Sequence, residues 1–272
     1  MTRIVPSTAT ARSLRTLGWI AVLALGLVVG SPGVVGGWSG VAAAQSQRMG
    51  DLFDDGTPPT IEPRFNERVP MNLTFTNDRG ETIQLGSLFQ DDRPVILTLV
   101  YFNCPSLCNM VLNDLTDTLK ALNPDDNPDW RVGNNFQVVT ASFDAREDHV
   151  LAAQNKAGYL RAYGQGDDVG DSWHFLTGTS ENNRALANSV GFGYQFVSNP
   201  GSSVKDIAHG SGIFVLTPDG RLSRFLSGLK YDPTQVRRSV MDASEGKITP
   251  SLIEQAIFTC FIYDPQSGSY VA

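Results

Sequence analysis

The chain has 272 residues and a formal charge of −7, from 21 Lys and Arg against 28 Asp and Glu. This acidic balance, together with the lack of any lysine- or arginine-rich run, argues against a nucleic-acid-binding protein. Three cysteines are too few for a disulfide scaffold, and the length is ample for one domain with a substantial hydrophobic core.

The first 44 residues are typical of an export signal. Three arginines precede a short apolar run over residues 18–29, and small residues ending at Ala44 form a cleavage site. Cleavage there removes the three arginines and no acidic residue, which takes the formal charge from −7 to −10. The alternative is an uncleaved membrane anchor, in which the apolar stretch extends through Val35. Both interpretations place the folded part outside the cytoplasm, in the periplasm or on the outer face of the cytoplasmic membrane.

Residues 45–67 are predicted to be a linker because they include a Gly-Thr-Pro-Pro sequence, and residues 68–272 are predicted to form the folded domain with a C-terminal helical extension. Apolar patterns predict strands over residues 72–76, 82–85, 94–102, 136–143, 173–176, 213–216 and 222–226. Helical spacing of apolar residues predicts helices over residues 107–122, 147–163, 181–190 (with Ser180 as the cap) and 249–260.

This order of elements predicts an α/β fold with a mixed central sheet and helices on both faces. The turn sequence Thr217-Pro218-Asp219-Gly220 predicts a hairpin between the last two strands. A cysteine pair at the exit of the first parallel strand, where a helix opens, is typical of the thioredoxin-like version of this class.

Two cysteines and one distant histidine form the candidate site. Cys104 and Cys108 lie four residues apart where the helix begins, a position expected to lower the pKa of the Cys104 thiol. Helical Cβ atoms at that spacing are about 5–6 Å apart, whereas a disulfide prefers about 3.8 Å. A metal therefore suits the pair somewhat better than a disulfide, although both states stay open. Soft thiolates select copper(I) and zinc, and His209, on an expected loop, is the candidate third ligand.

Other residues near these positions receive weaker assignments. Asp206 is a candidate acceptor that orients the imidazole from outside the metal's ligand set, with an ordinary loop aspartate as the alternative. His149 is expected to be solvated and His174 to be structural. Cys260 falls in an apolar helical stripe and is expected to be a buried free thiol, and Met110 is expected to be a core residue rather than a thioether ligand.

The dithiol and the histidine resemble the Sco/SenC family of copper-binding, thioredoxin-like proteins. Residues 104–108 read Cys-Pro-Ser-Leu-Cys, which matches the C-P-x-x-C of that family, and His209 follows about a hundred residues later, before a strand-turn-strand. The resemblance covers about residues 70–230. Residues 142–148 also resemble the family's S-x-D-P-x-R-D element, with Ala145 in place of its proline.

Two positions depart from the family pattern. Ser106 and Asn109 stand where an acidic residue and a proline are frequent, so the charge and the partner contacts of the helix opening are expected to differ. The tail after Lys230 is also longer than in compact members of the family.

The resemblance implies copper(I) held by Cys104, Cys108 and His209, with copper(II) on the same residues plus an added ligand. It further implies ligand-exchange delivery to the dinuclear copper centre of cytochrome c oxidase subunit II. Other periplasmic copper donors and thiol-disulfide proteins are the further partners, and membrane contact is expected only through an N-terminal anchor.

Three alternatives stay open. A thiol-disulfide oxidoreductase would act on partner cysteines, although C-x-x-C spacing is absent. A peroxidase would need an arginine, and none flanks Cys104. A structural zinc site is usually closed by four ligands rather than three.

Overall fold

In the computed structural model of this chain, residues Ala44–Ala272 form one compact unit. It describes residues 59–89, 91–104, 107–122, 130–164, 167–197, 206–250, 262–264 and 269–271. The predicted signal, most of the predicted linker, Cys260 and all but the first two residues of the helix predicted over 249–260 lie outside these residues, so those assignments stay predictions.

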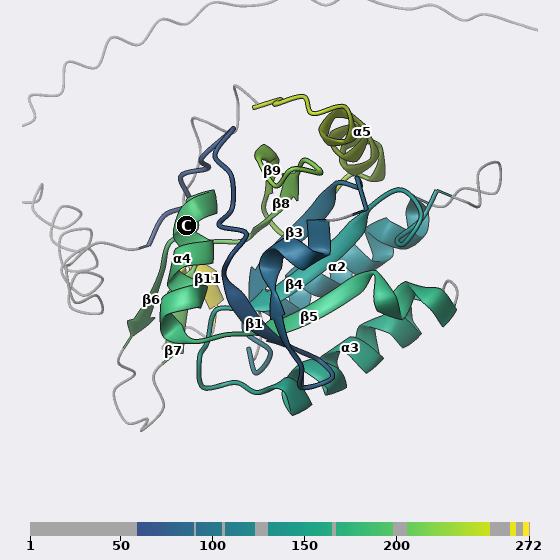
Figure 1. Ribbon diagram of the computed structural model, residues 1–272. Helices are drawn as coiled ribbons and strands as arrows, with labels where there is room; N and C mark the ends of the chain where they lie inside the picture. Colours follow the sequence, from purple (N-terminus) through teal and green to yellow (C-terminus); the bar gives the residue numbers. More distant parts are fainter. Residues whose placement is uncertain are drawn as a thin grey trace, which may run out of the picture. The chain divides into compact units, whose positions relative to one another are not determined.

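A seven-stranded sheet with the order β2-β1-β5-β4-β3-β8-β9 forms the centre of the fold (Figure 1). Its strands are β1 (Thr74–Asn77), β2 (Thr82–Gln84), β3 (Val95–Val100), β4 (Gln137–Ser142), β5 (Trp173–Thr177), β8 (Gly212–Leu216) and β9 (Leu222–Ser227). The strands β3, β4 and β5 run parallel, whereas β8 pairs antiparallel with β3 and β1 antiparallel with β5. Every residue of β3 and β4 is buried, as expected for central strands covered on both faces.

Helices cover both faces of this sheet. They are η1 (Leu85–Phe89), α2 (Leu107–Ala121), α3 (His149–Tyr163), η2 (Asp167–Asp171), α4 (Ser180–Val190) and α5 (Pro233–Ser244). One hydrophobic core lies under α2, α3 and α5, and a second lies under α4 and the strand pair of β6 (Tyr194–Val197) and β7 (Asp206–His209). The predicted α/β fold, with a mixed sheet and helices on both faces, is confirmed.

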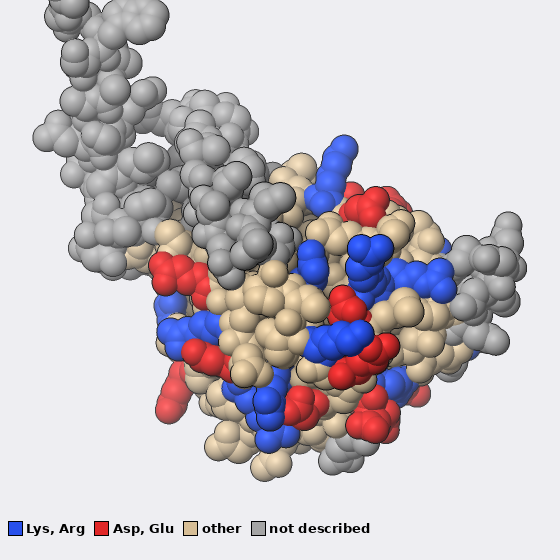
Figure 2. All heavy atoms as spheres, turned by 90° about the horizontal axis from the view of Figure 1, so that it is seen from above, with Lys and Arg blue, Asp and Glu red and all other residues tan. Residues whose placement is uncertain are grey.

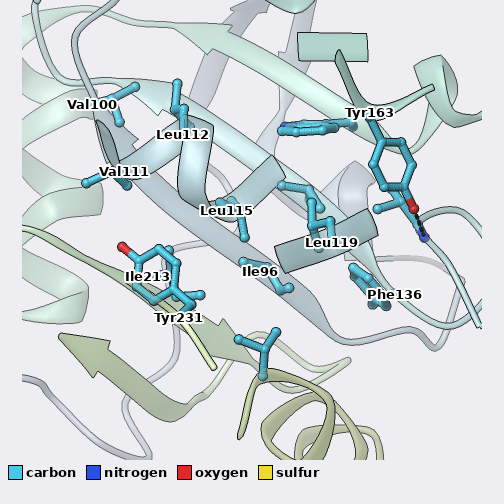
Figure 3. Close-up of a cluster of buried hydrophobic side chains, with 14 of the residues drawn as sticks. Ile96, Val100, Val111, Leu112, Leu115, Leu119, Phe136, Tyr163, Ile213 and Tyr231 are labelled. Carbon is cyan, nitrogen blue, oxygen red and sulfur yellow. Dashed lines mark hydrogen bonds between the residues drawn. The ribbon is translucent and has the colours of Figure 1, made fainter. Parts of the chain in front are cut away.

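The helix α2 is anchored to the sheet by one apolar stripe (Figure 3). Leu115 and Leu119 are fully buried there and face Ile96 of β3, with Ile213 of β8 in the same cluster. Burying each leucine contributes about 1.5–3 kcal/mol to the stability of the folded state. This packing fixes the position of the first turn of α2, which carries Cys108.

Two local predictions were wrong, and one helix was missed. His209 ends the strand β7 rather than lying on a loop, because β7 pairs with β6 along its whole length. The helix α4 is capped by Thr179, one residue before Ser180. The helix α5 was not predicted, because its apolar face consists of only a few residues, although Asp232 caps it and Pro233 opens it.

Charged side chains of both signs are interspersed over the face shown in Figure 2.

Within the described part of the chain, no helix is both long and apolar enough to cross a membrane. A short hairpin of β10 (Ile262–Asp264) and β11 (Ser269–Val271) completes the described elements.

His174 of β5 is structural, as expected. Its Nε2 atom lies 3.0 Å from the side-chain oxygen of Gln137, and the buried ion pair of Lys156 and Asp78 is nearby. Burial, followed by the charge of Lys156, lowers the pKa of His174 from 6.5 to about 4. Since protonation then favours the unfolded chain, the stabilisation is complete above pH 6.5 and is lost as the pH falls toward 4.

A His174→Gln protein should therefore lose this component of its pH dependence. Urea unfolding at several pH values between 7 and 4 measures it, and the free energy of unfolding should fall less steeply in the variant than in the wild type. His149→Gln, at an exposed histidine, is the control and should keep the wild-type profile. Parallel profiles for His174→Gln and the wild type would contradict the assignment.

Candidate metal centre

The three candidate ligands meet at the carboxyl end of the parallel strands, where open α/β sheets commonly bind ligands. Cys104 lies in the turn after β3, where its backbone N–H donates to the carbonyl of Tyr101 over 3.2 Å. Cys108 is in the first turn of α2 and His209 ends β7. The three potential ligand atoms lie within 4.8 Å of one another, and all three residues are buried.

Both cysteines are free thiols, and each sulfur accepts a backbone hydrogen bond. The Cys108 N–H donates to Cys104 Sγ over 3.3 Å, and the Tyr101 N–H donates to Cys108 Sγ over 3.4 Å. Burial, and then the neighbouring Cys104, raises the pKa of the Cys108 thiol well above its ordinary value. At Cys108, burial therefore outweighs the lowering of the thiol pKa that a helix N-terminus can produce. Binding of a metal ion would have to displace this proton.

The imidazole of His209 presents one defined nitrogen to the thiols. Its Nδ1 atom lies 2.7 Å from the carbonyl oxygen of Gly210, and its Nε2 atom lies 3.4 Å from Cys108 Sγ. Because a carbonyl can only accept, Nδ1 carries the hydrogen and Nε2 keeps its lone pair for a metal. The role predicted for Asp206 stays a prediction, since the Gly210 carbonyl already accepts from Nδ1.

Aromatic rings enclose His209. The ring centroids of Tyr101, Phe143 and Phe192 lie 6.0, 5.1 and 5.9 Å from its own, and only 5% of the residue is exposed. Phe143 is also stacked on Tyr194, with centroids 4.8 Å apart. This enclosure restricts the ring to few orientations and keeps water from the thiol side.

Glu147 and Asn109, to which the sequence analysis gave no role in the site, hydrogen-bond to the backbone of the loop that contains Cys104. The carboxylate of Glu147 accepts hydrogen bonds from the backbone N–H groups of Phe102 and Asn103, both at 2.7 Å, and from Ser142 Oγ at 2.6 Å. Burial nevertheless raises the pKa of Glu147. The side chain of Asn109 donates to the Cys104 carbonyl over 2.9 Å. Residues 142–148 and Asn109 stood out in the sequence, but their bonds depend on the tertiary fold.

The other sequence candidates are not among the three clustered ligands. The expectation that Met110 is a core residue was wrong, since 47% of it is exposed. His149 is exposed, as expected. Asp206 begins β7 opposite Val197 and is half-buried.

Two sulfurs and one imidazole nitrogen suit a soft metal ion such as copper(I). Of the residues described, only these three form a cluster of His, Cys, Asp and Glu ligands. Three protein ligands leave a coordination position open, which a structural zinc site ordinarily does not. The residues present therefore fit a soft metal ion held by three protein ligands.

Comparison with known proteins gives a family and a fold. A family model described as SCO1/SenC matches residues 61–244. A search of curated proteins gives no match.

Many solved structures are similar to the chain, among them the following three. A candidate electron transfer protein from Aquifex aeolicus VF5 is 21% identical with a TM-score of 0.54, over 67% of this chain and 95% of that chain. ScoI of Arabidopsis thaliana with copper bound is 16% identical with a TM-score of 0.49, over 64% of this chain and 96% of that chain. A SCO1/SenC family lipoprotein from Bacillus anthracis str. Ames is also 16% identical with a TM-score of 0.49, over 68% of this chain and 96% of that chain.

At 21% identity the Aquifex aeolicus structure shows a shared fold and nothing finer. The family model, in contrast, matches more than half of the chain and includes Cys104, Cys108 and His209. The chain therefore belongs to the SCO1/SenC family.

Proposed function

We propose that this protein is an exported copper chaperone that carries copper(I) on Cys104, Cys108 and His209. The observation that carries the proposal is the convergence of the three ligand atoms within 4.8 Å in a buried, aromatic-walled site. Copper is the cargo rather than a resident cofactor. The same residues with one added ligand would hold copper(II).

The proposed recipient is the dinuclear copper centre of cytochrome c oxidase subunit II. Recipient thiolates would replace the donor ligands one at a time, so that copper is never released to water. The imidazole is the natural first ligand to leave, because it is neutral while the two thiolates are charged. An N-terminal signal or anchor would place the protein in the periplasm or on the outer face of the cytoplasmic membrane, where this recipient domain would lie.

A transfer experiment tests this proposal. The copper(I)-loaded protein is mixed anaerobically with the metal-free, reduced copper domain of subunit II, and the copper content of both is measured after separation. Copper should move to the recipient faster than from a small-molecule copper(I) chelate of equal affinity. Copper that stays on the donor, or that moves no faster than from the chelate, would overturn the proposed delivery.

A second candidate function is thiol-disulfide exchange with partner cysteines. The observation that favours it is the closeness of two free thiols, with the Cys104 sulfur hydrogen-bonded to the backbone of Cys108. In this reaction a partner disulfide would gain two electrons and two protons, and the Cys104–Cys108 pair would become a disulfide. A Cys108→Ser protein that accumulates a mixed disulfide through Cys104 would support it.

A further inference from the structure

The backbone of the loop that contains Cys104 is held from two sides. The N–H groups of Phe102 and Asn103 donate to the two oxygens of the Glu147 carboxylate, each over 2.7 Å. From α2, the side chain of Asn109 donates to the Cys104 carbonyl over 2.9 Å. Hydrogen bonds on both sides of Cys104 therefore fix the main chain of this loop.

Glu147 is itself placed firmly between the end of β4 and the start of α3. Its backbone N–H donates to the Asp144 carbonyl over 3.2 Å, and Ser142 Oγ of β4 donates to its carboxylate over 2.6 Å. The next residue, Asp148, caps α3 by accepting from the Leu151 N–H. The carboxylate thus has a rigid base from which to hold the neighbouring loop.

The carboxylate provides acceptors where the pairing of β3 with β4 ends. The last paired residues are Val100 and Ser142, and the Phe143 N–H donates to the Val100 carbonyl just beyond them. The next backbone donors of the loop after β3 turn to the Glu147 carboxylate instead. Hydrogen bonds to an ionised acceptor are about twice as strong as neutral ones, so a single side chain can order this turn.

We infer that Glu147 is a positioning residue for metal binding, whose carboxylate fixes the main chain at Cys104 so that the sulfur is already in place for the ion. Ordering a loop on binding costs free energy, and a loop that is held in advance avoids much of that cost. The metal part of this inference rests on the proposed function, whereas the ordering of the loop does not.

Glu147→Gln keeps the size of the side chain but leaves one acceptor oxygen for two backbone donors. The first readout needs no metal: the amide proton that loses its acceptor, at Phe102 or Asn103, should exchange with solvent at least about tenfold faster, measured by NMR. The second readout is copper(I) affinity, measured anaerobically by chelator competition. It should fall about tenfold, the lower end of the range for residues that support metal ligands.

A double-mutant comparison separates positioning from general stability. A Cys104→Ser protein has no sulfur to position at that site, so adding Glu147→Gln should lower its remaining affinity by less than about twofold. In a His209→Leu protein, the same addition should again lower the affinity about tenfold.

The sign of the effect separates positioning from charge. Burial, then Cys104 and last the charge of Glu147 raise the pKa of the Cys108 thiol. Removal of that charge alone would therefore favour the thiolate and strengthen metal binding. A fall in affinity would report the lost hydrogen bonds instead.

Asp114→Asn is the matched control. The half-buried carboxylate of Asp114 in α2 also accepts a backbone N–H over 2.7 Å, from Tyr231 in the segment before α5. Its replacement should leave both the exchange of the loop amides and the copper(I) affinity unchanged. Asn109→Ala, a change at an exposed position, should lower the affinity about fivefold and serves if Glu147→Gln does not fold.

Unchanged amide exchange or wild-type copper(I) affinity in a folded Glu147→Gln protein would overturn the inference. So would an equal fall of affinity in Asp114→Asn or in the Cys104→Ser background. If only Asn109→Ala folds, wild-type affinity in that protein would overturn it. Absence of copper(I) binding in the wild type would instead overturn the proposed function, and the amide exchange would still decide whether Glu147 orders the loop.

Discussion

A His209→Leu protein is expected to remain folded and to lose at least about a hundredfold in copper(I) affinity. Mutation of a residue that only hydrogen-bonds to a metal ligand lowers metal affinity by about 10–100-fold. Loss of a ligand itself should therefore lower the affinity at least as much. Leucine is preferred to alanine because the aromatic rings around position 209 would leave a cavity beside a small side chain. The measurement is an anaerobic competition titration of the reduced protein against a copper(I) chelator.

The matched control is His149→Leu, the same change at an exposed histidine outside the site. It should bind one equivalent of copper(I) with wild-type affinity. Cys104→Ser should weaken binding at least as much as His209→Leu, since a thiolate is the stronger soft ligand. Wild-type affinity in a folded His209→Leu protein would contradict the three-ligand site and move thiol-disulfide exchange to first place.

Phe143→Ala is expected to cost about 3–5 kcal/mol of the free energy of unfolding, the range for a large aromatic side chain in a core. Phe143 is 1% exposed, and its ring lies beside those of Tyr101, Tyr194 and His209. The cavity would also free the imidazole, so copper(I) affinity should fall with stability. Urea unfolding measures the first effect and the chelator titration the second.

Phe225→Ala separates these two effects. Phe225 of β9 is fully buried, and its ring packs on Phe214 with centroids 4.8 Å apart, without a recorded ring contact to His209. It should cost a similar free energy of unfolding without changing copper(I) affinity. Equal losses of affinity in the Phe143 and Phe225 variants would show that affinity follows general stability and not the aromatic wall.

The sequence predicted the central strands and both cysteines' positions because these depend on local rules. Continuous apolar runs produced β3 and β4, and the leucine spacing of α2 placed Cys108 in the first turn of a helix that buries one apolar face. The choice of His209 from three histidines came from the presence of the dithiol, from its position before the predicted hairpin and from the family resemblance. The structure brings it to the thiols.

The rest could not be predicted because it depends on partners distant in the sequence. The strand β7 was missed because it is formed by pairing with β6, and its four residues are too few to carry a pattern of their own. The carboxylate of Glu147 looks like an ordinary surface group until the fold places it under the backbone of residues 102 and 103. The contacts of Tyr101 are equally invisible, since an aromatic residue at a strand end reads as core.

The division of the ligands between two cores has a mechanical consequence. Two sulfurs belong to the layer under α2, and one nitrogen to the layer containing β6 and β7. A bound ion would cross-link these two layers at the carboxyl end of the parallel strands. When the imidazole is replaced first by a recipient thiolate, this cross-link would be undone while the two sulfurs still hold the ion.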